Sequence, residues 1–64
     1  MGKDATYQVT RRHVRGSRII RELVAGGFEH RESAADYITT VIGVPVGPDS
    51  SRDVWYTVDR ERRA

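Results

Sequence analysis

Apolar and polar residues alternate over residues 5–14, and this alternation predicts the first strand of the fold. Tyr7 and Val9 are separated by polar positions, and Tyr, Val and Thr all favour extended backbone. Gly16 and Ser17 follow and suit a two-residue turn of type II′, because glycine supplies the positive φ at its first central position. The pattern therefore predicts a β-hairpin whose second strand begins directly after this turn.

The turn also predicts the register of the hairpin, because residues at equal distances from it face each other. The predicted pairs are Val14 with Ile19, Arg12 with Arg21, Arg11 with Glu22, Thr10 with Leu23 and Val9 with Val24. The Val9–Val24 pair is apolar on both sides and the Arg11–Glu22 pair has opposite charges, and both are stabilising. Arg12 opposite Arg21 is a like-charge pair, which destabilises a sheet unless an anion or an acidic partner relieves it.

A helix over residues 18–25 is the alternative for this segment. Positions i, i+1, i+4 and i+5 are taken by Ile19, Ile20, Leu23 and Val24, which also makes a helical stripe. Ser17 can cap the start of such a helix, and Gly26-Gly27 can end it. The window is too short for periodicity to decide, so strand and helix both stay open.

The clearest helix is predicted from His30 to Ile42. Acidic residues lie toward its N-terminal half, where they suit the helix dipole. Gly43 ends this helix, and the prolines at positions 45 and 48 prevent it from continuing. The residues predicted to form its inward stripe are Ala34, Ala35, Tyr37, Ile38, Val41 and Ile42.

The remaining chain predicts a loop and a last strand. Residues 43–51 are rich in Gly, Pro and Ser and are expected to form a mobile loop, and alternation resumes over residues 52–60. The prediction is a single α+β domain over residues 1–64 in the order β-β-α-β, a three-stranded antiparallel sheet with one helix packed on one face. The alternative order is β-α-α-β, with a helix at residues 18–25.

Residues 27–38, with the sequence GFEHRESAADYI, resemble the strand-to-helix junction of small ββαβ modules. In these modules an aromatic residue ends a strand, a capping residue follows two positions later, and the helix opens with an Ala on the sheet. His30 stands where Ser or Thr is the better cap. The stretch also resembles the turn before the second helix of ribbon-helix-helix DNA-binding proteins, which implies a first helix longer than residues 18–25.

One helix covers only one face of a three-stranded sheet. On the sheet, the predicted covered face carries Tyr7, Val9, Ile20, Val24, Phe28, Val54, Tyr56 and Val58. The opposite face carries Thr10, Arg12, Val14, Ile19, Arg21, Leu23, Trp55 and Thr57. Aliphatic side chains and a Trp in water are typical of an interaction site, so Val14, Ile19, Leu23 and Trp55 are the predicted interface residues. If the strand parity shifts by one, Trp55 belongs to the core instead.

Composition narrows the function classes. The chain has 64 residues and no Cys, which excludes disulfide scaffolds, thiolate zinc sites and thiol nucleophiles and favours a cytoplasmic location. No apolar run reaches the roughly 18 residues that cross a membrane, so no membrane partner is expected. Residues 1–4 and 61–64 are expected to fray. Of the 11 basic residues all but Lys3 are Arg, a bias typical of GC-rich codons and so of a GC-rich bacterium or its phage.

Charge is distributed unevenly along the chain. Residues 1–21 hold six basic residues against one acidic residue, so they carry +5, whereas residues 22–64 hold five against eight and carry −3. His13 and His30 have no acidic neighbours at a metal-ligand spacing, and no glycine run matches a phosphate-binding motif. The chain is therefore expected to have no catalytic residue, metal, cofactor or small-molecule substrate, and not to be an enzyme.

Two functions follow from the charge and the faces. The leading one is a binding module that uses the basic hairpin on nucleic acid, because a two-stranded ribbon fits the major groove and Arg suits phosphate and guanine. Its candidate residues are Arg11, Arg12, His13, Arg15, Arg18 and Arg21. The alternative is a protein-interaction module or a homodimeric accessory protein that uses the outer face around Trp55.

Overall fold

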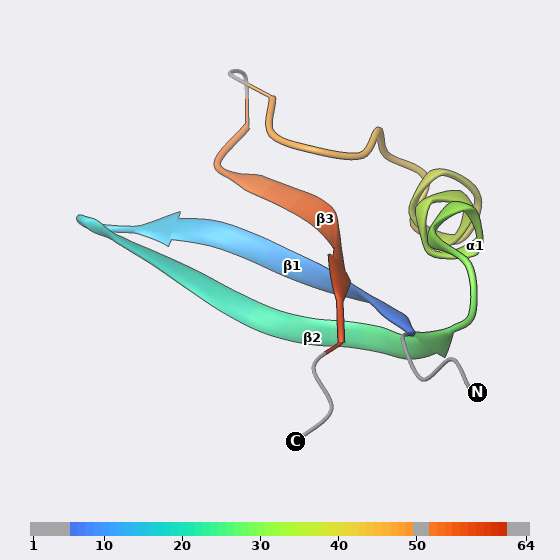
Figure 1. The fold of residues 1–64 in the computed structure, drawn as a ribbon. Helices are drawn as coiled ribbons and strands as arrows, with labels where there is room; N and C mark the ends of the chain where they lie inside the picture. Colours follow the sequence, from blue (N-terminus) through green and yellow to red (C-terminus); the bar gives the residue numbers. More distant parts are fainter. Residues whose placement is uncertain (1–5, 50–51, 62–64) are drawn as a thin grey trace.

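The structure is a computed structural model that describes residues 6–49 and 52–61. Its elements are β1 (Tyr7–Arg15), β2 (Arg18–Phe28), α1 (Arg31–Asp36), η1 (Tyr37–Ile42) and β3 (Val54–Arg60). The strands form one antiparallel sheet in the order β2-β1-β3, and α1 and η1 form one continuous helical segment (Figure 1). The expected three-stranded antiparallel sheet with one helix is confirmed. The alternative helix at residues 18–25 is wrong, because this segment belongs to β2, and the ribbon-helix-helix resemblance fails with it.

The hairpin of β1 and β2 has the predicted turn. Gly16 has φ +63° and Ser17 has no positive φ, as a type II′ turn requires. The predicted pairs are present from Val14–Ile19 down to Thr10–Leu23. The sequence of turn residues was therefore sufficient to fix the register of the outer half of the hairpin.

The predicted pairing of Val9 with Val24 is wrong, because the strand contains a bulge there. Val9 faces Ala25 instead, and a shift in register separates this pair from the pair formed by Thr10. The extra residue leaves Val24 exposed and gives its expected place on the covered face to Ala25. A second irregularity follows before Tyr7 meets Phe28.

The helical segment begins one residue later than predicted and changes its winding halfway. η1 is a π-helix, and its end is marked by an i→i+5 hydrogen bond of 2.8 Å from the Gly43 amide to the Ile38 carbonyl. Because each residue turns less about the axis in a π-helix, Ile42 follows Ile38 toward the sheet and Val41 points to solvent. The prediction that Val41 packs inward is therefore wrong. Gly43 ends the helix with φ +87°, as predicted.

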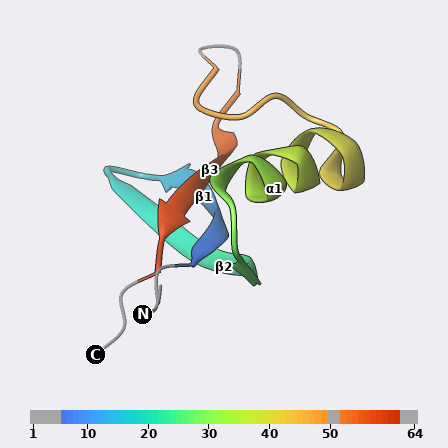
Figure 2. The same ribbon diagram turned by 45° about the vertical axis from the view of Figure 1, so that its right-hand side comes forward.

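The core lies at one end of the sheet. Val9, Ala34 and Ile38 are fully buried. Beside them, the ring centroids of Phe28 and Tyr37 lie 5.6 Å apart. The half-buried residues around this centre are Tyr7, Phe28, Tyr37, Ile42, Val44, Tyr56 and Val58. Figures 1 and 2 both show the helical segment far from the hairpin tip, so the helix covers only part of its face of the sheet.

β3 begins at Val54, two residues after the predicted start, and keeps the predicted parity. Tyr56 and Val58 pack against the core, and Trp55 lies opposite Arg12 on the other face. The loop before β3 is joined to it by a 2.8 Å hydrogen bond from the Gly47 amide to the Tyr56 carbonyl. No helix in the described part of the chain is long and apolar enough to span a membrane.

Glu61, which lies in the segment expected to fray, joins the ends of all three strands. Its amide donates to the Thr6 carbonyl at 2.8 Å, and its carboxylate accepts hydrogen bonds from the Thr6 hydroxyl and the Gly27 amide. Gly26 makes room for this carboxylate, because a Cβ there would lie 2.5 Å from Glu61 Oε2. The expectations for residues 1–4 and 62–64 lie outside the described residues.

Candidate functional site

The face of the sheet turned away from the helical segment, called the open face below, carries the candidate surface. Strand alternation and the observed register assign its residues. They are Gln8, Thr10, Arg12 and Val14 on β1, Ile19, Arg21 and Leu23 on β2, and Trp55, Thr57 and Asp59 on β3. The open face therefore contains every residue that was predicted for it.

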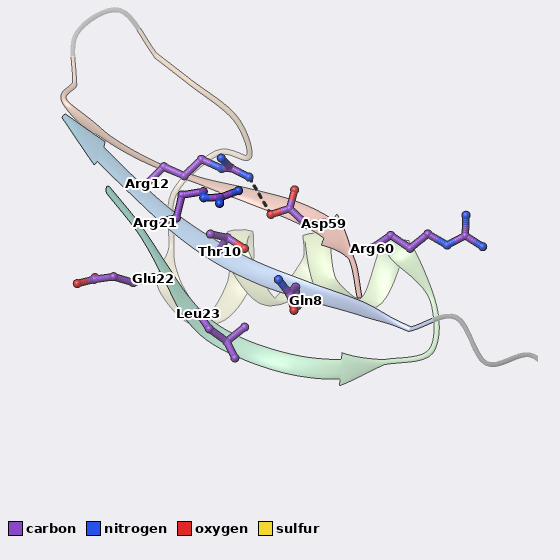
Figure 3. Close-up of a pocket in the computed structure, with 8 residues that line it drawn as sticks. All are labelled: Gln8, Thr10, Arg12, Arg21, Glu22, Leu23, Asp59 and Arg60. Atoms are coloured by element: carbon purple, nitrogen blue, oxygen red, sulfur yellow. Dashed lines mark hydrogen bonds and ion pairs between the residues drawn. The ribbon is translucent and has the colours of Figure 1, made fainter. Parts of the chain in front are cut away.

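An Arg–Asp network crosses the open face from β1 to β3 (Figure 3). Arg12 Nη2 donates to Asp59 Oδ2 at 3.0 Å, and Arg12 Nε donates to Thr57 Oγ1 at 3.0 Å. The Thr57 hydroxyl donates in turn to Asp59 at 3.2 Å. The Arg12 guanidinium is thus neutralised within the chain.

The environment of Asp59 favours its charged form. Burial by itself would raise the pKa of Asp59, but the nearby Thr10 hydroxyl, the hydrogen bonds from Arg12 and Thr57 and the charge of Arg12 together hold it below its ordinary value. Thr10 is only 5% exposed, and although its hydroxyl lowers this pKa it makes no hydrogen bond of ordinary length and angle. Asp59 is the acidic partner that the like-charge pair of Arg12 and Arg21 requires.

The six residues predicted to bind nucleic acid are divided between the two faces of the hairpin. Arg12 and Arg21 lie on the open face, and the other four, Arg11, His13, Arg15 and Arg18, lie on the opposite face. Arg11 makes an ion pair of 2.8 Å with Glu22, as their facing positions predicted. Two of the five arginine charges are therefore matched inside the chain. Arg15 and Arg18 face each other at the exposed tip, without an ion pair among the described residues.

Of the four predicted interface residues, three are exposed on the open face. Val14, Ile19 and Leu23 are all exposed, and they lie on either side of the Arg12–Arg21 pair. Trp55 is half-buried and borders a hollow of about 270 Å³ with the loop that precedes β3. The apolar part of the surface is therefore concentrated on β2 and the tip of the hairpin.

A second hollow, of about 630 Å³, occupies the open face above β1 (Figure 3). Its lining residues are Gln8, Thr10, Arg12, Arg21, Glu22, Leu23, Asp59 and Arg60. Three arginines and two acidic residues make it a mixed, polar surface. Among the residues that the structure describes, no three His, Asp or Glu side chains are grouped to hold a metal ion.

The free edge of β2 is the feature that sequence reasoning missed. Because β1 is the central strand, no described strand pairs with the outer edge of β2, and none of its residues is buried. In a hairpin with a two-residue turn, the pair next to the turn exchanges hydrogen bonds and every second pair does the same. The amides and carbonyls of Ile19, Arg21 and Leu23 therefore point outward, away from β1.

Comparisons with protein-family models, curated proteins and solved structures found no match to this chain.

Proposed function

We propose that this chain is a small, non-enzymatic protein-binding module of the cytoplasm that docks through β2. The observation that carries the proposal is the free edge of β2 together with Val14, Ile19 and Leu23, three exposed aliphatic residues beside it. An unpaired edge offers a row of backbone donors and acceptors to an added strand, and adjacent apolar side chains supply contact area.

The small core supports the same proposal. Only Val9, Ala34 and Ile38 are fully buried among the described hydrophobic residues. A chain of this size has little surface to bury on its own, and association is a common way to add to it. Docking on β2 covers apolar area that the helical segment, at the other end of the sheet, leaves in water.

Nucleic-acid binding is the second candidate function, and the hairpin tip is the observation that favours it. Arg15 and Arg18 are exposed on either side of the turn and reach no acidic partner among the described residues. The ion pairs of Arg11 and Arg12 reduce the charge available beyond the tip. We rank this candidate below protein binding for that reason.

A photo-crosslinking amino acid tests the proposed function. We would introduce it at Leu23, which is 67% exposed on β2, and at Val41, which is 66% exposed on the helical segment. Irradiation in cells that express the full chain is expected to give a protein adduct from position 23 and little from the matched position 41. Equal adducts from both positions, or adducts to nucleic acid alone, would contradict protein docking through β2.

A further inference from the structure

We propose that the partner of the β2 edge is a second copy of this chain, paired antiparallel through residues 18–22 with Ile20 on the two-fold axis. The inference rests on the proposed function, because it names the partner for the same surface. The two sheets would join into one of six strands, with a β2 strand from each copy at its centre.

The backbone of β2 suits this pairing. Its outward amides and carbonyls belong to Ile19, Arg21 and Leu23, at every second position. A two-fold axis normal to the sheet pairs residues that lie on the same face, and with Ile20 on the axis Ile19 faces Arg21 of the second copy. The outward amides and carbonyls of one β2 strand then face those of the other β2 strand on both sides of the axis, as the hydrogen bonds of an antiparallel ladder require.

The side chains of β2 are complementary to themselves in this register. Arg18 of each copy faces Glu22 of the other, so two oppositely charged pairs flank the axis. The two Ile20 side chains meet on the axis itself, where a close, non-hydrogen-bonded pair brings side chains nearest to each other. Charge and apolar contact thus favour the same alignment.

Registers displaced toward the far end of β2 are opposed by the same charges, and the register centred on Ile19, which has no such clash, lacks the two Arg18–Glu22 pairs. Centring the pair on Arg21 places two guanidinium groups against each other, and centring it on Glu22 does the same with two carboxylates. Farther along the strand, the bulge at Val24 interrupts the regular edge. The charges of β2 therefore act against pairing farther along the strand and favour the self-pairing centred on Ile20.

The position of the helix leaves room for a second copy. The helical segment lies beside the far end of the sheet, and the part of β2 next to the turn extends away from it (Figures 1 and 2). Both faces of this part of β2 are therefore clear of the chain's own helix. The exposed aliphatic residues Ile19 and Leu23 would lie along the new seam on the open face.

Single-cysteine variants of the full chain test the register, because the natural sequence has no cysteine. Ile20→Cys is expected to form a disulfide-linked dimer on mild oxidation, since facing Cα atoms in such a pair are about 4.5 Å apart, within the range of a disulfide. Arg21→Cys, the next residue on the same edge, is the matched control and is expected to give about tenfold less linked dimer. Non-reducing electrophoresis and intact mass measure both.

A charge exchange tests the same pairs without a disulfide. Arg18→Glu and Glu22→Arg are each expected to weaken self-association by at least about tenfold, because each places two like charges opposite each other. Mixing the two variants should restore a dimer, since both cross-copy pairs again have opposite signs. Arg15→Glu is the control on β1, and its mass by sedimentation equilibrium should match that of the unmodified chain.

Each outcome has a defined meaning. More linked dimer from Arg21→Cys than from Ile20→Cys, or equally little from both, overturns the register, and failure of the mixed charge variants to associate overturns self-pairing. If Glu22→Arg does not fold, as circular dichroism would show, the cysteine pair decides alone. A crosslink from Leu23 to a different protein would keep the proposed function and reject the second copy as partner. No preferential crosslink at Leu23 would reject both.

Discussion

The two ends of the sheet are held together by different forces. At the end near the helical segment, Val9, Ala34 and Ile38 form a dry core, and the Glu61 carboxylate joins the strand ends. At the hairpin end, the helix is absent and the strands are joined by their ladder, by the Arg11–Glu22 ion pair and by Arg12, whose side chain reaches back along the open face to Asp59. One end is apolar and closed, and the other is charged and open.

This difference separates stability from binding along one short sheet. Side chains at the closed end pack against each other, and removing one of them should destabilise the fold. Ile19 and Leu23, at the open end, make little use of their apolar surface within the chain, and their loss should change association instead. Substitutions at the two ends therefore test whether the division is real.

The largest effect is expected from Ile38→Ala, which empties the centre of the closed end. Removing a fully buried aliphatic side chain commonly costs about 2–5 kcal/mol, a large part of the stability of so small a domain. Val41→Ala, on the exposed side of the same helical segment, should change the free energy of unfolding by less than about 0.5 kcal/mol. Urea denaturation measures both, and equal losses would contradict the observed orientation of η1.

The helix, the three strands and the turn were predictable because each has a local signal. Gly16-Ser17 defines its own turn and hence the neighbouring pairs, and Gly43 marks the end of the helix. The bulge at Val24 and the π-helical winding that exposes Val41 were not, since both arise when strand and helix adjust to a shared core. Local periodicity contains no information on that adjustment.

The set of residues on the open face was predictable, but the ion pair of Arg12 across that face was not. Alternation placed Arg12 and Trp55 on the same face, as observed. The partner of Arg12 could not be predicted, because Asp59 becomes its neighbour only when β3 pairs with β1 and leaves β2 at the edge. The order of strands in the sheet is a property of the whole chain, and the free edge of β2 follows from it.

Gly26→Ala should have the next largest effect at the closed end. The new methyl group would meet Glu61 Oε2 at 2.5 Å, so the carboxylate has to leave its hydrogen bonds with Thr6 and Gly27. We expect a loss of about 1–3 kcal/mol in the free energy of unfolding. In the Glu61→Ala background the same substitution should cost clearly less. Additive losses in this double-mutant cycle would show that the two positions do not interact.

A smaller effect is expected from acid at the Arg12–Asp59 pair on the open face. The pKa of Asp59 is lowered in the fold, so its contribution to stability is present above the ordinary carboxyl pKa of about 4 and is lost as the pH falls through the lowered value. Asp59→Asn should therefore be less stable than the unmodified chain at neutral pH, and the difference should shrink on acidification. Thermal unfolding from pH 7 to pH 2 measures this. A constant difference would indicate that the Arg12–Asp59 pair contributes nothing through its charge.

The smallest effect is expected for the salt dependence of nucleic-acid binding. This dependence reports how many phosphates the cations of the hairpin can neutralise. With Arg11 and Arg12 in ion pairs, the hairpin cations left to meet phosphates are Arg15, Arg18 and Arg21. Counterion release then limits the slope of log K against log salt concentration to about −3 on duplex DNA.

Arg15→Ala combined with Arg18→Ala should flatten that slope by about two units, and Arg31→Ala on the helical segment should leave it unchanged. Fluorescence anisotropy with a labelled duplex between 50 and 200 mM salt measures it. A slope much steeper than −3 would mean that phosphates displace Glu22 and Asp59 from their arginines, so that the open end exchanges internal ion pairs for external ones on binding. An affinity for the duplex that changes neither with salt concentration nor with the double substitution would contradict any role of the Arg15 and Arg18 charges in binding.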